Sequence, residues 1–216
     1  MRSSEMKIIE NSNLPPKVLI ADDHSMIRKG LKLYLQVNLG VSDVSEVSNC
    51  NDLMKELIKN KYTHLILDII LSDGSTLEVI PNITKVYPNL KIMVFSMQPA
   101  EVYGEALKRY GLNHYLSKSV GDEEILEALS AFIKEDSAAV FNHTPSYKDN
   151  PFSALAPREL EILHYLLRGM RTKEISEAIN LKMNTVSTIK TRIYAKTKAE
   201  NLKDLLELAT LYNVNY

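Results

Sequence analysis

The sequence predicts an α/β fold, a five-stranded doubly wound parallel sheet, followed by a second, small all-helical domain. Short apolar runs rich in β-branched residues alternate with longer amphipathic stretches from Lys17 onward, which is typical of repeated βα units. The alternation stops near Glu135, and four helical patterns with short connections follow a polar stretch. A chain of 216 residues has room for two domains of ordinary size.

The strands of the first domain are predicted where short apolar runs occur, at residues 18–21, 44–47, 64–67, 92–95 and 114–116. Helical patterns lie between and after these runs, at residues 26–37, 53–58, 77–86, 102–107 and 125–133. The first, third and fourth runs are almost entirely apolar, as expected of parallel strands that helices cover on both faces. Functional sites in such sheets lie at the carboxyl ends of the strands.

The polar stretch divides the chain into an extension at residues 1–16, the α/β domain at 17–135, a linker at 136–152 and the helical domain at 153–216. The linker is predicted from its two prolines, its Ser, Asn and Asp residues and its lack of apolar periodicity. The helices of the last domain are predicted at residues 157–169, 172–180, 184–198 and 202–212.

The composition excludes several classes of protein. No apolar run is long enough to span a bilayer, and residues 1–16 lack the apolar core of a secretory signal, so we expect a cytoplasmic protein without membrane contacts. The single cysteine, Cys50, excludes an intrachain disulfide and a cysteine-based zinc cluster. Of the net charge of −1, residues 150–216 carry +3 and the rest carry −4, which favours different partners for the two domains.

Polar side chains follow four of the predicted strands: Asp22 and Asp23, Asp68, Ser96, and Lys118. Each has an ordinary explanation as a helix cap, turn residue or surface charge. A doubly wound sheet brings these strand ends into one crevice, where three carboxylates repel one another unless a cation lies among them. Mg²⁺ suits such a site, and a carboxylate beside it can accept a phosphoryl group whose oxygens Ser and Lys then bind.

The segment at residues 18–31, VLIADDHSMIRKGL, resembles the start of the receiver domain in response regulators of the NarL/FixJ family. The resemblance extends to about Ile133 and implies a flavodoxin-like receiver. In that family the acidic pair, here Asp22 and Asp23, holds Mg²⁺ together with the phosphoacceptor, here Asp68, and the backbone carbonyl of Ile70.

The same resemblance gives roles to the later strand ends. The phosphoacceptor matches the aspartate of HLILD at residues 64–68, and the conserved hydroxyl and lysine of the family match Ser96 and Lys118. The switch pair of the family matches Ser96 and Tyr115. Two positions depart from the usual pattern, because Ser72 and Ser119 stand where prolines are common.

A phosphatase of the haloacid dehalogenase type would also use a strand-end aspartate with Mg²⁺. It requires a second aspartate two residues after the nucleophile, and that position is Ile70. We therefore set this alternative aside.

The helical domain has the pattern of a helix-turn-helix, in which apolar residues at helical spacing join the second and third helices. The stretch at residues 181–199 contains five basic residues and no acidic residue, and it would present Ser187, Thr188, Thr191 and Arg192 on one face with Lys190 beside them. On charge alone a solvated helix face explains this stretch. The helix-turn-helix layout favours insertion of the third helix into the DNA major groove.

This domain resembles the LuxR-type DNA-binding domain at LAPRE (155–159), KEI (173–175) and TV (185–186). The resemblance implies that Lys182, Ser187, Thr188, Lys190, Thr191 and Arg192 contact double-stranded DNA. Ser187 and Ile189 stand where the family often has Lys and His. The last helix pairs two domains in this family, and an apolar stripe at residues 202, 205, 206 and 209 suits pairing as well as core packing.

We therefore expect a transcription factor of a two-component system, switched by phosphorylation of Asp68 from a sensor histidine kinase or a small phosphodonor, and a homodimer when active. No enzymatic activity is expected beyond its own phosphoryl transfer and dephosphorylation. Two rival hypotheses are a phosphorylation-independent regulator and a helical domain that binds protein rather than DNA. The intact strand-end set argues against the first, and the acid-free stretch at residues 181–199 argues against the second.

Overall fold

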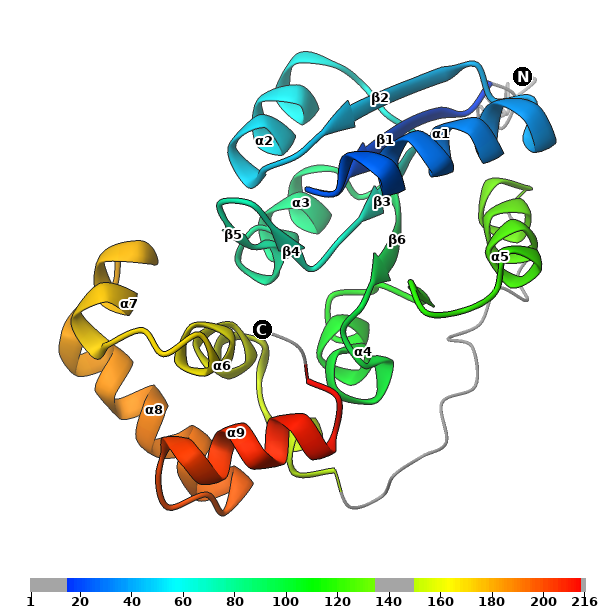
Figure 1. The fold of residues 1–216 in the computed structure, drawn as a ribbon. Helices are drawn as coiled ribbons and strands as arrows, with labels where there is room; N and C mark the ends of the chain where they lie inside the picture. Colours follow the sequence, from blue (N-terminus) through cyan, green and yellow to red (C-terminus); the bar gives the residue numbers. More distant parts are fainter. Residues whose placement is uncertain (1–14, 135–149, 215–216) are drawn as a thin grey trace, which may run out of the picture.

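The computed structural model of the chain describes residues 15–134 and 150–214. The five strands of the main sheet run parallel in the order β2-β1-β3-β6-β7 (Figure 1). They are β1 (Lys17–Ala21), β2 (Asp43–Val47), β3 (His64–Leu67), β6 (Lys91–Ser96) and β7 (His114–Ser117). The predicted doubly wound sheet is confirmed. Most of the predicted extension and of the linker lies outside the described residues.

Helices cover both faces of the sheet, which explains the apolar character of its central strands. The helix α1 (Ser25–Leu39) and the helix α5 (Asp122–Lys134) pack on the face that presents Val18 and Ile20 (Figure 1). The opposite face, which presents Leu19 and Ala21, is covered by α2 (Cys50–Lys59), α3 (Ile80–Val86) and α4 (Ala100–Lys108).

The strand register brings the carboxyl ends of the central strands together. Ala21 of β1 is paired with Leu67 of β3, and Leu67 is paired with Val94 of β6. Ser96, the last residue of β6, is paired with Ser117 of β7. The residues that follow these strands therefore lie along one edge of the sheet.

A short hairpin follows β3 and was not predicted from the sequence. It consists of β4 (Ile70–Leu71) and β5 (Gly74–Ser75), followed by the 3-10 helix η1 (Thr76–Glu78). Gly74 has φ +147°, a conformation that favours glycine, and this allows the chain to reverse. The predicted helix at residues 77–86 is therefore divided into η1 and α3.

The second domain contains η2 (Pro151–Ala154), α6 (Pro157–Leu167), α7 (Thr172–Ala178), α8 (Met183–Thr197) and α9 (Leu202–Leu211). All four predicted helices are present. Phe152, placed in the linker by its polar neighbours, is fully buried and its ring lies 6.3 Å from that of Tyr212. The packed domain therefore includes the end of the predicted linker.

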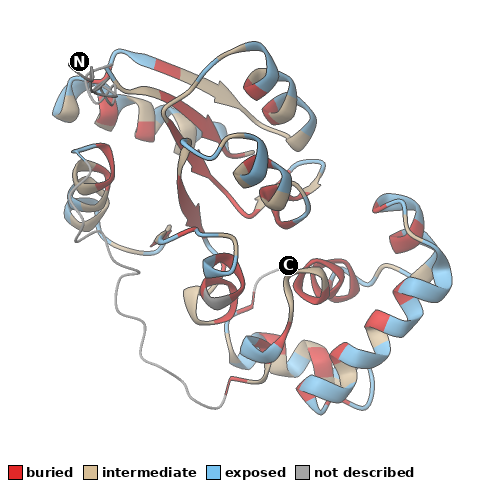
Figure 2. Cartoon of the chain, turned by 180° about the vertical axis from the view of Figure 1, so that it is seen from behind, coloured by how far each residue is buried: buried red, intermediate tan, exposed pale blue. Residues whose placement is uncertain are grey.

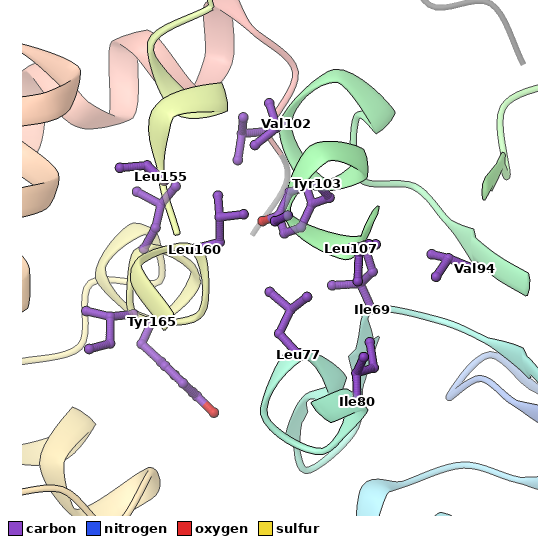
Figure 3. Packing of buried hydrophobic residues seen from close by; sticks show 14 of the residues in the cluster. Ile69, Leu77, Ile80, Val94, Val102, Tyr103, Leu107, Leu155, Leu160 and Tyr165 are labelled. Carbon is purple, nitrogen blue, oxygen red and sulfur yellow. The ribbon is translucent and has the colours of Figure 1, made fainter. Parts of the chain in front are cut away.

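One apolar cluster joins the two domains. It continues from the α2–α4 face of the sheet into the helical domain, where α6 is buried from Glu159 to Leu167. Figure 3 shows Leu155 and Leu160 of the helical domain facing Val102, Tyr103 and their neighbours on the receiver side. A helix that is buried on nearly all sides must pack against other elements on each side. Helix α6 does so because it lies between the sheet domain on one side and α8 and α9 on the other (Figure 1).

Candidate functional site

The strand-end residues form a compact buried cluster, here called the carboxylate site and defined as Asp22, Asp23, Asp68, Ser96 and Lys118. Its side chains come from the ends of β1, β3, β6 and β7, as the sequence predicts. Asp22, Asp68 and Ser96 are at most 6% exposed. Charged side chains at this depth need partners, because the desolvation of an unpaired carboxylate is costly.

Lys118 supplies the positive charge of the site. Its Nζ lies 2.6 Å from Asp22 Oδ2 and 2.5 Å from Asp68 Oδ2, and its side chain is 4% exposed. The hydroxyl of Ser96 donates to the other oxygen of Asp68, Oδ1, at 2.6 Å. Both oxygens of Asp68 are thus held by the groups that would bind a phosphoryl group.

The acidic residues at this edge also have the geometry of a cation site. One ligand atom from each of Asp22, Asp23, His24 and Asp68 can be chosen so that all lie within 4.8 Å of one another. His24 Nδ1 lies 2.7 Å from Asp23 Oδ1, and the His24 backbone N–H donates to Asp22 Oδ1 at 2.8 Å. Carboxylate oxygens are the ligands that Mg²⁺ prefers, so the donor set fits this ion.

The predicted switch residues are linked to the carboxylate site through Gln98. The Tyr115 hydroxyl donates to the Gln98 carbonyl at 2.7 Å, and the Gln98 N–H lies 3.4 Å from Ser96 Oγ. Tyr115 is 4% exposed, and burial raises the pKa of its hydroxyl well above the ordinary value. The phenol therefore stays neutral and acts as a donor.

Sequence reasoning missed two residues that support the site. The fully buried hydroxyl of Thr76 donates to the carbonyl of Asp68 at 2.9 Å and connects the end of β3 to η1. Arg28 donates to the carbonyl of Asp22 at 2.7 Å and pairs with Glu46 at 3.4 Å. Arg28 lies in the segment that carries the resemblance, whereas no local signal identifies Thr76.

The predicted DNA face lies on the exposed side of α8. Ile175, Val186, Ile189 and Ile193 are buried at the contact between α7 and α8. The opposite side of α8 is open to solvent (Figure 2), and the predicted contact residues are all exposed except for the partly buried Lys190: Lys182, Ser187, Thr188, Lys190, Thr191 and Arg192. The structure therefore brings these side chains together on one accessible helix.

One basic residue of the acid-free stretch has a different environment. Lys196 Nζ lies 2.6 Å from Glu159 Oε2 and donates to the Ala154 carbonyl at 3.1 Å. Glu159 also accepts the Ala156 N–H at 2.7 Å, at the start of α6. Lys196 thus holds α8 against the beginning of α6, and counting charges along the sequence does not reveal this.

Most of the apolar stripe of α9 packs against the core of its own domain. Leu205 and Ala209 are fully buried, and Leu202 and Leu206 are half-buried against the core. Leu211, at the end of the helix, is 70% exposed. Core packing therefore accounts for much of the stripe.

Comparison with known proteins agrees with both parts of this geometry. Residues 18–130 match the response regulator receiver domain, which is more than half of the chain, and residues 153–209 match the luxR family of bacterial regulatory proteins. The chain is a response regulator of the NarL/FixJ family. A response regulator with a LuxR-type DNA-binding domain regulates transcription and is not a classical enzyme.

Similar proteins share nearly the full length of this response regulator. It is 27% identical to the oxygen regulatory protein NreC of Staphylococcus haemolyticus over 208 residues, which cover 89% of this chain and 96% of NreC. It is also 27% identical to the response regulator UvrY of Escherichia coli K12 over 201 residues, or 89% and 92% of the two chains.

One solved structure is similar to this response regulator over both domains. RcsB from Salmonella enterica serovar Typhimurium, bound to a promoter in the presence of the phosphomimetic BeF3−, has a TM-score of 0.78 to this response regulator at 25% identity. The match covers 92% of this chain and 100% of RcsB. Within the described residues, no helix of the response regulator combines the length and the apolar character that a bilayer crossing requires.

Proposed function

We propose that this response regulator is phosphorylated on Asp68 and that phosphorylation controls its binding to DNA. The observation that carries the proposal is the position of Lys118, whose ammonium lies between Asp22 and Asp68 while Ser96 holds the second oxygen of Asp68. A phosphoryl group on Asp68 adds negative charge and acceptor oxygens at the point where these two donors already meet.

In the proposed reaction an ionised oxygen of Asp68 attacks the phosphorus atom of the donor. The bond from phosphorus to the leaving atom breaks, and the leaving atom keeps the electron pair. For a sensor histidine kinase the leaving atom is a ring nitrogen of its phosphohistidine, and for a small phosphodonor it is an oxygen or nitrogen. Ser96 and Lys118 then donate to the transferred phosphoryl oxygens.

Asp22, Asp23 and Asp68 would hold Mg²⁺ together with the backbone carbonyl of Ile70. When bound, this ion supplies positive charge that offsets the crowded carboxylates and the incoming phosphoryl oxygens. The protein catalyses its own phosphorylation and dephosphorylation in this proposal. The switch would be transmitted from Ser96 through Gln98 to Tyr115, because these groups already form a chain of contacts.

The output of the switch is the binding of α8 to the major groove of double-stranded DNA. The proposed contacts are Lys182, Ser187, Thr188, Lys190, Thr191 and Arg192. The exposure of five of them on or just before α8, with Lys190 partly buried beside them, supports this role, since cations meet phosphates while neighbouring side chains reach base edges. The active form is proposed to be a cytoplasmic homodimer that reads paired half-sites. Its receiver is residues 17–135, and its DNA-binding domain, predicted at residues 153–216, also takes in Pro151 and Phe152 from the end of the linker predicted at 136–152.

The proposal is tested by incubating the full chain with Mg²⁺ and acetyl phosphate and measuring its mass. We expect one added phosphoryl group, lost in Asp68→Asn and retained in the control Asp43→Asn, whose side chain is 54% exposed in the same domain. Phosphate on a histidine or serine, or uptake that does not depend on Mg²⁺, would contradict the assignment.

A further inference from the structure

The contact between the two domains contains a cluster of three charges that the proposed function does not use: the buried Glu161, the partly exposed Arg158 and the exposed Glu78. Glu161 of α6 is 1% exposed, and its Oε2 accepts a hydrogen bond from the guanidinium of Arg158, one turn earlier. The same Arg158 nitrogen lies 3.6 Å from Oε1 of Glu78, which belongs to η1 of the receiver domain. Two carboxylates thus share one cation across the interface, and the three groups together carry a net charge of −1 when both carboxylates are ionised.

The second oxygen of Glu161 makes this arrangement sensitive to protons. Oε1 is buried and has no hydrogen-bond partner among the described residues, although the carboxylate of Glu78 lies within reach of Glu161. A hydrogen bond between the two carboxylates forms only when one of them carries a proton. Burial raises the pKa of Glu161 to about 7, against the lowering effect of Arg158 and with a further increase from Glu78.

The other titratable groups around Glu161 do not offset its charge. Cys50, at the start of α2, is close enough for its thiol pKa to be raised by burial, by Asp73 of the hairpin and by Glu78 and Glu161. Tyr165, one turn along α6, also has a raised pKa, because of its burial and the nearby acidic groups. Arg158 is therefore the cation that faces Glu161 in this set.

The rest of the contact is tight around the cluster. A Cβ atom on Gly74, at the turn of the hairpin, would lie 3.0 Å from the hydroxyl of Tyr165. Leu160 of α6 and Leu77 beside Glu78 belong to the apolar cluster that joins the domains (Figure 3). Separation of the domains would therefore return Glu161 to water and move its charge away from the partly buried Cys50.

We propose that Glu78, Arg158 and Glu161 form a proton-dependent latch, which holds the receiver against the DNA-binding domain when the two carboxylates share a proton and weakens when that proton is lost. In the closed form described here the proton is retained up to about neutral pH, whereas in an open form Glu161 has the ordinary pKa of 4.5. The ratio of closed to open molecules should then fall about tenfold between pH 6 and pH 8.

The latch fixes the position of the DNA-binding domain relative to the receiver. It does not cover α8, because the outer face of this helix is exposed in the closed form. It does not require phosphorylation and is independent of the proposed phosphoacceptor. The latch is nevertheless connected to the proposed phosphoacceptor, because Thr76, two residues before Glu78, is hydrogen-bonded to the Asp68 carbonyl.

The test uses the single cysteine of the native sequence. The rate at which N-ethylmaleimide labels Cys50 in the full, unphosphorylated chain is measured from pH 6 to pH 8 in wild type and in Glu161→Gln. Labelling proceeds through the open form, in which Glu161 no longer faces Cys50, so thiol ionisation there is the same in the two proteins and the ratio of the two rates reports opening. We expect this ratio to rise about tenfold over the range, because only the wild type loses the shared proton.

Glu127→Gln, an exposed change on α5, serves as the control and should follow the wild type. A flat ratio, or a Glu161→Gln protein that opens with pH as the wild type does, would overturn the latch. If Glu161→Gln does not fold, Glu78→Gln replaces it and should reduce the rise, because it removes the acidic partner while the burial of Glu161 remains. Carbon-13 titration of the Glu161 carboxyl provides a direct check, with a pKa near 7 expected and a value near the ordinary 4.5 contradicting the proposal.

Discussion

In the carboxylate site, side chains from different strands form ion pairs and hydrogen bonds with one another. On the outer face of α8, the hydrogen bonds of the side chains are made within the helix itself. Lys118 contacts two carboxylates at 2.6 Å or less and is almost fully buried. On α8, the hydroxyls of Thr188 and Thr191 donate to carbonyls four residues earlier in the same helix. Arg192 is exposed.

This difference separates two kinds of functional surface. The carboxylate site is organised before its substrate arrives, so the loss of one member leaves an uncompensated buried charge. The outer face of α8 is solvated, and under the proposed function it contributes binding free energy only when DNA replaces water. We therefore expect changes in the first region to be large and changes in the second to be graded, and the following predictions test this contrast in order of effect.

The largest effect is expected for Lys118→Met. The variant keeps the length of the side chain but leaves Asp22 and Asp68 facing each other in a buried site, which should cost about 3–5 kcal/mol of unfolding free energy. Urea denaturation in the presence of a chelator measures the loss, and added Mg²⁺ should restore part of it. Lys55→Met, at a lysine that is 76% exposed, is the control and should change little. Equal stability of the two variants would contradict the pre-organised charge cluster.

A buried histidine in the DNA-binding domain tests whether a large loss of unfolding free energy comes from burial of the group or from its position in the receiver domain. His164 is 3% exposed, neither of its ring nitrogens has a hydrogen-bond partner among the described residues, and burial together with Arg168 lowers its pKa to about 4. The unfolded histidine binds a proton below pH 6.5, while the folded one does so only near pH 4. Stability from neutral His164 is therefore complete above pH 6.5 and lost as the pH falls to 4.

Between pH 7.5 and pH 4 this linkage should remove about 3 kcal/mol of unfolding free energy. His164→Leu should lack this component, so the difference in stability between wild type and variant should change by that amount over the range. Chemical denaturation at both pH values provides the measurement. A constant difference would show that His164 is protonated in the folded protein over the same pH range as in the unfolded protein.

A smaller loss is expected on α8. Arg192→Ala and Lys190→Ala should each weaken DNA binding by about 1–3 kcal/mol if they reach bases. If they contact only phosphates, the loss should be similar for all sequences and the salt dependence of binding should become shallower. Titration of labelled DNA at several salt concentrations separates these outcomes.

Lys196→Ala provides the matched control for these two variants. Its ammonium is bound to the buried Glu159 and to the Ala154 carbonyl, so the variant should lose about 1–3 kcal/mol of stability while DNA affinity and salt dependence stay unchanged. Loss of DNA binding in Lys196→Ala with no loss in Lys190→Ala and Arg192→Ala would place the interface elsewhere.

The smallest effect concerns the lifetime of the phosphorylated state. Hydrolysis needs a water molecule opposite the phosphorylated oxygen. The backbone N–H of the half-buried Ile70 lies 3.4 Å from Asp68 Oδ1, and we expect its side chain to flank that approach. Ile70 offers no hydrogen bond to hold a water molecule, so decay should be slow. Ile70→Asn should accelerate it by up to about tenfold, equal to about 1.4 kcal/mol. Decay of the wild type at the same rate or faster would show that Ile70 does not shield the phosphoryl group.

The sequence determined the sheet, because helical and strand periodicities reflect which face of each element is buried. It also placed Asp22, Asp68, Ser96 and Lys118 together, since parallel strands must bring their carboxyl ends to one edge. Helix α8 was predictable for the same reason: its apolar spacing defines the buried side and leaves the polar side for DNA.

Only the tertiary structure decided which charges are paired across the molecule. Periodicity describes one element at a time, so it does not reveal that Lys196 holds Glu159, that Phe152 is buried beyond a polar stretch, or that Thr76 supports Asp68. The partnership of Glu161 with Glu78 is the clearest case, because residues 83 positions apart in the sequence share a cation only after the two domains have packed.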